Sequence, residues 1–416
     1  MEFSCFADKA GAVSAIGRLM DDLAAGLRPG VRVSMLGGGN PAAIPEANRV
    51  FRRAMRRLLR DPAAFDRALG VYDPPQGNEA FIEALVERLQ RDLGWPVTPR
   101  HVALTLGSQT ALFLLLNMLS GRFPDGSRRR ILFPLTPEYI GYADAALEPG
   151  CWCARRPRIE RLDPPFFKYR IDFDRLGLDE GFGAVCVSRP TNPTANVLTD
   201  AEIERLWKLC RAQDIPLIID SAYGEPFPGI VFAEAAPFWR EGVIACLSLS
   251  KLGLPGLRTG VVVADPEVIE RLGRMTAIVS LAPVRLGAAL AADLVASGEM
   301  SRLCADVIRP FYQKRAEEAV AAATEAFDGL DVRLHAVEGA FFLWIWFRDP
   351  ARSSLRLYRR LKERGIIVVP GRPFAFGLDR PWTHADRCVR INIGQDPAEV
   401  RRALAVLAEE CRAPGA

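Results

Sequence analysis

One lysine stands where a nucleophilic amine would be useful. The chain has 416 residues and only six lysines, and Lys251 lies between two short apolar runs, residues 242–247 and 260–265. These runs predict buried strands, whereas the other five lysines are expected in amphipathic helices or polar loops. Because an amine in a partly desolvated site has a lowered pKa and becomes nucleophilic, Lys251 is a candidate for forming an imine with an aldehyde.

Further polar residues come directly after predicted strands. In parallel α/β sheets, ligands bind beyond the carboxyl ends of the strands, so we expect these residues to converge at one edge. They lie at 107–110, 137–139, 189–192, 220–223, 248–251 and 258.

The side chains at this edge describe one ligand. Ser108 begins a predicted helix, whose N-terminus attracts anions, and Ser248 and Arg258 add donors for the same anion. Asp220 ends a buried strand, where a lone carboxylate is costly unless it meets a cation. A phosphate, a protonated ring nitrogen for Asp220 and an aldehyde for Lys251 together indicate pyridoxal 5′-phosphate (PLP).

The sequence also resembles a known family nearly end to end, the fold-type-I PLP-dependent aminotransferases of class I/II, and among them the valine–pyruvate-type enzymes. The stretches that carry the resemblance are LMDDL, LGGGNPAAIPE, YDPPQG, FPLTPEYIGYADA, SRPTNPT, PFPGIVF, SLSKLGLPG, EGAFFLW and CVRIN. It implies amino transfer between a valine- or alanine-like L-amino acid and a pyruvate-like 2-oxo acid.

The resemblance also implies a role for each site residue. Lys251 would hold PLP as a Schiff base and shuttle a proton, and Asp220 would pair with the pyridinium nitrogen. Tyr223 and Asn192 would bond the ring's phenolic oxygen, and Tyr139 would stack on the ring. The residues around the phosphate would be Ser108, Gln109, Ser248, Arg258 and Tyr72, the last from the neighbouring subunit of a homodimer with shared active sites.

Arg390, Gly39 and Asn192 would contact the substrate, and the first two would bind its carboxylate. Arg390 would clamp it with two parallel hydrogen bonds, and Gly39 would offer backbone nearby. Without the family, Arg390 in a strand is equally open to pairing with an acid such as Glu338.

Two arginines, Arg285 and Arg372, depart from the valine–pyruvate pattern. A pocket for an isopropyl group should be apolar, and a buried unpaired arginine there is costly. Either these side chains point away from the site, or they determine specificity for an anionic substrate. The second possibility favours another PLP reaction with an anionic co-substrate, such as β- or γ-elimination or replacement, decarboxylation or C–C bond formation. A PLP-fold transcription regulator is a further alternative, but no helix-turn-helix segment or basic face is evident.

The elements that must position these residues alternate between strand and helix. Near-continuous apolar strands separated by helices predict a mostly parallel, seven-stranded sheet covered on both faces. We expect an N-terminal arm over residues 1–47 with an amphipathic helix at 16–27, a large PLP-binding domain over 48–300 and a small α+β domain over 301–416. The arm is expected to pack on the small domain. Thr199 and Glu202 form a capping box that predicts a helix start.

The composition limits the remaining possibilities. The net charge of +4 gives no reason to expect nucleic acid or an anionic membrane as a partner. The N-terminus has no apolar signal-peptide run, and no segment is apolar for long enough to span a bilayer. Nine scattered cysteines favour reduced thiols in a cytoplasmic protein, and no metal site is expected.

Overall fold

A central sheet carries the residues that follow the predicted strands. The computed structural model describes residues 2–11, 17, 21 and 33–413, and within them this sheet has the order β2-β11-β10-β9-β8-β4-β3, with β5 also paired to β4. Strands β10, β9, β8, β4 and β5 pair in parallel, and β11 is antiparallel to β10 and β2. The mostly parallel α/β fold is confirmed. Over the described residues, the sheet has eight strands instead of the predicted seven. The additional strand is the short β3, which pairs antiparallel with β4. The strand bounds are β2 Val102–Thr105, β3 Gly121–Arg122, β4 Arg128–Phe133, β5 Trp152–Ala154, β8 Phe182–Ser188, β9 Leu217–Asp220, β10 Val243–Ser248 and β11 Gly260–Val263.

A second sheet has the order β15-β16-β13-β12-β7-β6. Most of it comes from the C-terminal part of the chain, but the antiparallel hairpin β6–β7 comes from residues 158–170 and pairs in parallel with β12 through β7. The division of the chain at residues 47 and 300 stays a prediction, and it does not follow the membership of this sheet. The bounds are β6 Arg158–Arg161, β7 Phe166–Arg170, β12 Val332–His335, β13 Phe342–Phe347, β15 Val369–Pro370 and β16 Cys388–Asn392.

The end of the N-terminal arm lies against this C-terminal region, whereas Lys9 of α1 (Cys5–Ala10) donates to the carbonyl of Ala146 in the region predicted as the large domain. Strand β1 (Ser34–Met35) pairs in parallel with β14 (Ile366–Ile367). Most of the helix predicted at 16–27 lies outside the described residues. This pairing fixes the start of the glycine-rich segment that follows β1 and lies between the two larger sheets.

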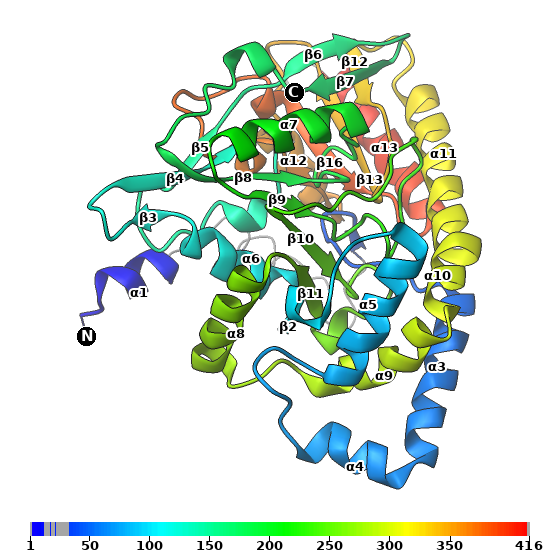
Figure 1. Cartoon of the computed structure of the whole chain (residues 1–416). Helices are drawn as coiled ribbons and strands as arrows, with labels where there is room; N and C mark the ends of the chain where they lie inside the picture. Colours follow the sequence, from blue (N-terminus) through cyan, green and yellow to red (C-terminus); the bar gives the residue numbers. More distant parts are fainter. Residues whose placement is uncertain (1, 12–16, 18–20, 22–32, 414–416) are drawn as a thin grey trace.

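Helices surround the sheets, and α11 runs along one side of the molecule (Figure 1). The capping box predicted at Thr199 is present at the start of α7. A π-helical turn at Cys304–Ile308 joins α10 to α11. The helix bounds are α1 Cys5–Ala10, α3 Pro45–Arg60, α4 Pro62–Gly70, α5 Glu79–Leu93, α6 Ser108–Met118, α7 Asp200–Ala212, α8 Pro266–Ser280, α9 Arg285–Ala296, α10 Glu299–Leu303, α11 Arg309–Ala326, α12 Ser354–Glu363 and α13 Pro397–Arg412.

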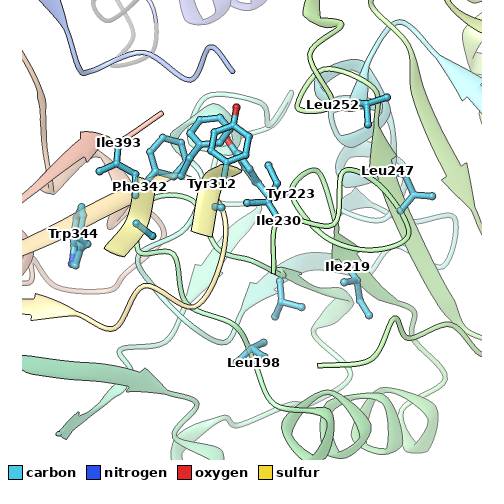
Figure 2. Close-up of a cluster of buried hydrophobic side chains, with 14 of the residues drawn as sticks. Leu198, Ile219, Tyr223, Ile230, Leu247, Leu252, Tyr312, Phe342, Trp344 and Ile393 are labelled. Atoms are coloured by element: carbon cyan, nitrogen blue, oxygen red, sulfur yellow. The ribbon is translucent and has the colours of Figure 1, made fainter. Parts of the chain in front are cut away.

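A continuous apolar core joins the two sheets. Figure 2 shows Leu247 and Ile219 of the central sheet on one side, and Phe342 and Trp344 of the second sheet on the other, with Tyr223 between them. The two sheets therefore share one packed interior, and the site described below lies on residues attached to both.

Candidate active site

Lys251 lies in the turn after β10, and its amine is directed at backbone. Its Nζ donates to the carbonyl oxygen of Gly39 at 2.6 Å and lies 5.5 Å from the ring centroid of Tyr223. Burial, reinforced by the positive charge of Arg390, lowers the pKa of Lys251 to about 8, although Asp220 acts in the opposite direction. No carboxylate among the described residues forms an ion pair with it. The amine is therefore closer to its nucleophilic form at neutral pH than an exposed lysine is.

Asp220 is the last residue of β9 and is buried. It accepts a hydrogen bond from the hydroxyl of Tyr142, and its Oδ1 accepts from the backbone N–H of Ala222 at 2.9 Å. Burial raises the pKa of Asp220, while the hydrogen bond from Tyr142 lowers it. The carboxylate has donors but no cation in contact, which is the environment that suits a positively charged ligand group.

An anion cradle forms where α6 meets the start of β11. Arg258, in the left-handed region at φ 46°, donates to the carbonyl of Leu106 at 3.4 Å. Gly107 precedes the first residue of α6, Ser108, and a Cβ on Gly107 would lie 2.3 Å from the Arg258 guanidinium. The lack of a side chain at Gly107 thus lets the guanidinium approach the helix N-terminus, where an anion is favoured.

Three more residues predicted at the phosphate have partners close to this cradle. Ser108 Oγ donates to the carbonyl of Leu247 at 3.1 Å, at the end of β10. Ser248 Oγ accepts from the backbone N–H of Ser250 at 3.1 Å, and Gln109 Nε2 donates to the carbonyl of Gly141 at 3.1 Å. The structure therefore brings Ser108, Ser248 and Arg258 together. Gln109 is the residue after Ser108 in α6.

The two predicted ring-contacting tyrosines line the same region. Tyr139 packs edge to face on Tyr142, with centroids 5.2 Å apart. Tyr223 packs edge to face on Phe341 at 5.1 Å. Burial raises the pKa of both hydroxyls, that of Tyr223 well above its usual value, so both remain neutral donors at physiological pH.

Arg390 on β16 is buried and has no acidic partner among the described residues. Its Nη1 donates to Asn192 Oδ1 at 2.6 Å and its Nη2 to the carbonyl of Gly37 at 2.5 Å. The guanidinium lies 4.4 Å from the ring centroid of Phe342, and its Nε has no hydrogen-bond partner. Burial lowers the pKa of Arg390 to about 10. The open alternative, a pair with Glu338, is wrong, because Glu338 pairs with Lys168 instead.

Three predicted residues are not joined to this cluster by any contact in the described part of the chain. Tyr72 lies between α4 and α5 with 77% of its surface exposed. Arg285 pairs with the buried Asp73 at 2.9 Å. Arg372 is 72% exposed and lies 3.7 Å from Asp386. Of the two readings for these arginines, the contacts favour the one in which they turn to acids of the chain itself.

Sequence reasoning missed several residues of the site. Tyr142 holds Asp220, Ser188 ends β8 and binds Glu138, and Asn392 donates to the carbonyl of Gly38 at 2.8 Å. Glu138 lies in the segment 137–139 that the strand-end rule selected, although no role was assigned to it, whereas Ser188 lies one position before the selected segment 189–192. Nothing in the sequence spacing joins them to Asp220, because that proximity arises from the pairing of β4, β8 and β9.

Together these groups fit PLP. The cluster offers an amine of lowered pKa, a buried carboxylate free of cations, an anion cradle at a helix N-terminus and a guanidinium whose Nε is unpartnered. No group of three or more metal-binding side chains occurs in the described ranges.

Comparison with known proteins settles the family. The model of aminotransferase class I and II matches residues 36–407. The chain belongs to this family. Class I and II aminotransferases use PLP, so the chain is a PLP-dependent transferase of the fold-type-I class.

Individual relatives of this aminotransferase are similar over almost their whole length. It is 46% identical to the valine–pyruvate aminotransferase of Escherichia coli over 99% of this chain and 98% of that protein. A solved amino-acid aminotransferase structure from Psychrobacter arcticum matches with a TM-score of 0.96 at 43% identity, covering 99% and 98% of the two chains. The valine–pyruvate aminotransferase structure from Salmonella typhimurium matches with a TM-score of 0.88 at 44% identity, covering 95% and 98%.

Eight cysteines are free and buried. Within the described ranges, no helix is both long and apolar enough to cross a bilayer.

Proposed function

We propose that this aminotransferase moves the amino group between a small aliphatic L-amino acid such as valine or alanine and a 2-oxo acid such as pyruvate. The observation that carries the proposal is the pair formed by Lys251, an amine of lowered pKa without an acidic partner, and Arg390, a buried guanidinium with its Nε unpartnered. The near full-length similarity to valine–pyruvate aminotransferases supports the choice of substrates.

PLP, when bound, supplies an aldehyde that takes the amino group and a ring that withdraws electrons from the amino acid's Cα. Lys251 would hold the cofactor covalently and, once released, would move a proton between the two reacting carbons. Asp220 would keep the ring nitrogen protonated, and Tyr223 and Asn192 would bond the ring's oxygen. Ser108, Gln109, Ser248 and Arg258 would hold the phosphate, and Tyr139 would cover the ring.

Arg390 would orient the substrate. Its planar guanidinium can bind a carboxylate through two parallel hydrogen bonds, and Asn192 Oδ1 fixes one edge of it. The carbonyl of Gly37 now occupies the other edge. An incoming α-carboxylate would therefore displace this carbonyl and bring Gly39, which contacts Lys251, next to the substrate.

We also propose that the enzyme is a homodimer. The 77% exposed Tyr72 would reach the phosphate bound by the partner subunit. Exposed apolar side chains at Leu69, Val71, Ile278 and Val279 support an interface on this side of the molecule. A cytoplasmic location is proposed as well, supported by the free, buried thiols.

The test is a panel of amino acids and oxo acids with the purified holoenzyme. Valine or alanine should convert the bound cofactor to its pyridoxamine form, and pyruvate should restore it. Borohydride reduction followed by peptide mapping should place the cofactor's mass on the peptide containing Lys251. An unchanged cofactor spectrum with both amino acids, together with an elimination or decarboxylation product detected by mass, would support the alternative reaction instead.

A further inference from the structure

A second buried carboxyl group, Glu138, lies behind the cofactor site. It follows β4 and its side chain is completely buried. Its Oε1 accepts from the backbone N–H of Ser188 at 2.9 Å, and its Oε2 lies 2.6 Å from Ser188 Oγ. The backbone N–H of Tyr139 is 3.3 Å from the same Oε2. No cation among the described residues forms an ion pair with Glu138.

Glu138 is connected to Asp220 by two hydroxyl groups. Ser188 Oγ lies 3.4 Å from the hydroxyl of Tyr142, and Tyr142 in turn bonds Asp220 Oδ2. The chain Glu138–Ser188–Tyr142–Asp220 therefore has three links. The strand ends of β4, β8 and β9 bring its members together.

Counting protons shows what this chain requires. Each link needs one proton, and the two hydroxyl groups supply only two. The third proton must sit on a carboxyl group at one end. With Glu138 neutral, the bonds run in one direction, from Glu138 to Ser188, then to Tyr142, then to ionised Asp220. With both carboxyl groups ionised, the link between Ser188 and Tyr142 has no proton, and two negative charges share one buried pocket.

We propose that Glu138 is a positioning residue of the cofactor site, which shares one proton with Asp220 through Ser188 and Tyr142 and leaves the single negative charge at Asp220. This inference rests on the proposed role of Asp220 as partner of the cofactor's ring nitrogen. In a concerted shift, the O–H bonds of Glu138, Ser188 and Tyr142 break while new O–H bonds form on Ser188, Tyr142 and Asp220, so the negative charge moves to Glu138 and the three hydrogen bonds reverse direction. A cation beside Asp220 holds the charge there.

The electrostatics of the surroundings agree with a neutral Glu138. Burial, together with the smaller effect of the negative charge of Asp220, raises the pKa of Glu138 to about 8. The hydrogen bonds from Ser188 act in the opposite direction. Like charges in one buried site cannot both ionise at ordinary pH. Among the described residues, the titratable groups coupled to Glu138 or Asp220 are Tyr139, Tyr142, Tyr223, Cys186, Cys246 and Lys251, and of these Lys251 alone is cationic.

Infrared spectroscopy of the cofactor-free protein tests where the proton is. The wild-type minus Glu138→Gln difference spectrum at pH 7 should contain a carboxylic-acid C=O band that shifts in D2O. Glu338→Gln is the matched control, because Glu338 pairs with Lys168 and should contribute a carboxylate band only. Absence of the acid band in the Glu138→Gln difference, or its presence only in an Asp220→Asn difference, would overturn the proposal.

Cofactor affinity tests the connection to Asp220. Glu138→Leu removes the donor toward Ser188 and should weaken PLP binding about threefold to tenfold, whereas Glu138→Gln keeps a donor there and should recover part of the lost affinity. Ser188→Ala removes the hydroxyl that connects Glu138 to Tyr142 and should weaken PLP binding about threefold to tenfold. Equal affinities of the wild type and Ser188→Ala would contradict the proposal. If the wild type fails to bind PLP at Lys251, the proposed function fails, whereas the infrared result on Glu138 stands.

Discussion

Lys168 is buried in β7 of the second sheet, whereas Lys251 is half-buried in the turn after β10 of the central sheet, and their partners differ. Lys168 Nζ, on β7, lies 2.5 Å from both carboxylate oxygens of Glu338 and donates to the carbonyl of Val197 at 3.0 Å. In the part of the chain that the structure describes, Lys251 Nζ, after β10, has a single hydrogen-bond partner, the carbonyl of Gly39.

The comparison separates a structural lysine from a chemical one. A buried ammonium that meets a carboxylate remains charged and holds its neighbours in place. A buried amine without such a partner loses its proton more readily and can attack an aldehyde. Burial alone therefore does not indicate function; the nature of the contacting group does.

The largest expected effect comes from removing the chemical amine. Lys251→Ala should lower kcat for transamination by about 10²–10⁴-fold through the loss of proton transfer alone. Single-turnover kinetics with pre-bound cofactor would measure it. Lys208→Ala is the control, since Lys208 is exposed on α7 and pairs with Glu204 at 3.2 Å. A Lys251→Ala enzyme that keeps a tenth of the wild-type kcat would contradict the assignment of Lys251 as the chemical lysine.

Removing the structural amine should instead affect stability. Lys168→Met leaves Glu338, whose side chain is 19% exposed, as a partly buried charge without its partner, and should lower the free energy of unfolding by about 3 kcal/mol. Urea denaturation followed by fluorescence would measure this. The double variant Lys168→Met/Glu338→Met should recover much of the loss, because no charge is then left unpaired. A single variant within about 1 kcal/mol of wild type would contradict the prediction.

The rate at which Lys251 captures the cofactor should depend on pH. Only the neutral amine attacks an aldehyde, so the rate of PLP capture should rise about tenfold per pH unit below the pKa and level off above it. For Lys251 that pKa is about 8. Because it is lowered from 10.5, the unfolded chain binds more protons at this group between these values, and its contribution to stability should rise with pH across that window.

Stopped-flow absorbance after mixing cofactor-free enzyme with PLP would give this profile. A rate that keeps rising to pH 10 would mean that burial does not change the amine. The Arg390→Gln variant tests the cause, since Arg390 lowers the pKa of Lys251 and its loss should move the plateau to higher pH.

The two lysines also show how far sequence reasoning reaches. Lys251 follows one predicted strand and Asp220 ends another, so a rule about strand ends was sufficient to select both. Lys168 was expected in a polar loop or an amphipathic helix. That expectation is wrong, because Lys168 lies buried in β7. The run FFKYR has an apolar pattern interrupted by one charge, and the acid that neutralises it is 170 positions away at Glu338.

The same limit applies to the site. Local pattern predicted the strands on either side of Lys251, the helix starts at Ser108 and Thr199, and the residues at the carboxyl edge of the central sheet. It did not predict Tyr142 as the partner of Asp220 or the carbonyl of Gly37 as the partner of Arg390, because both contacts depend on how separate segments pack. Pairings that arise from tertiary packing leave no periodic signal in the sequence.

The smallest expected effects concern the two arginines, to which the same rule about partners applies. Arg285 is 21% exposed and pairs with an Asp73 side chain that is 5% exposed, so Arg285→Met should lower the free energy of unfolding by about 1–3 kcal/mol. Arg372 is 72% exposed, and Arg372→Met should change it by less than about 0.5 kcal/mol. Both variants should keep the wild-type KM for the amino donor and the oxo acid, because these side chains turn to acids of the chain itself. If either variant raised the KM for an anionic substrate severalfold, that arginine would contact the substrate, and the prediction that it serves only to pair with an acid of the chain would be wrong.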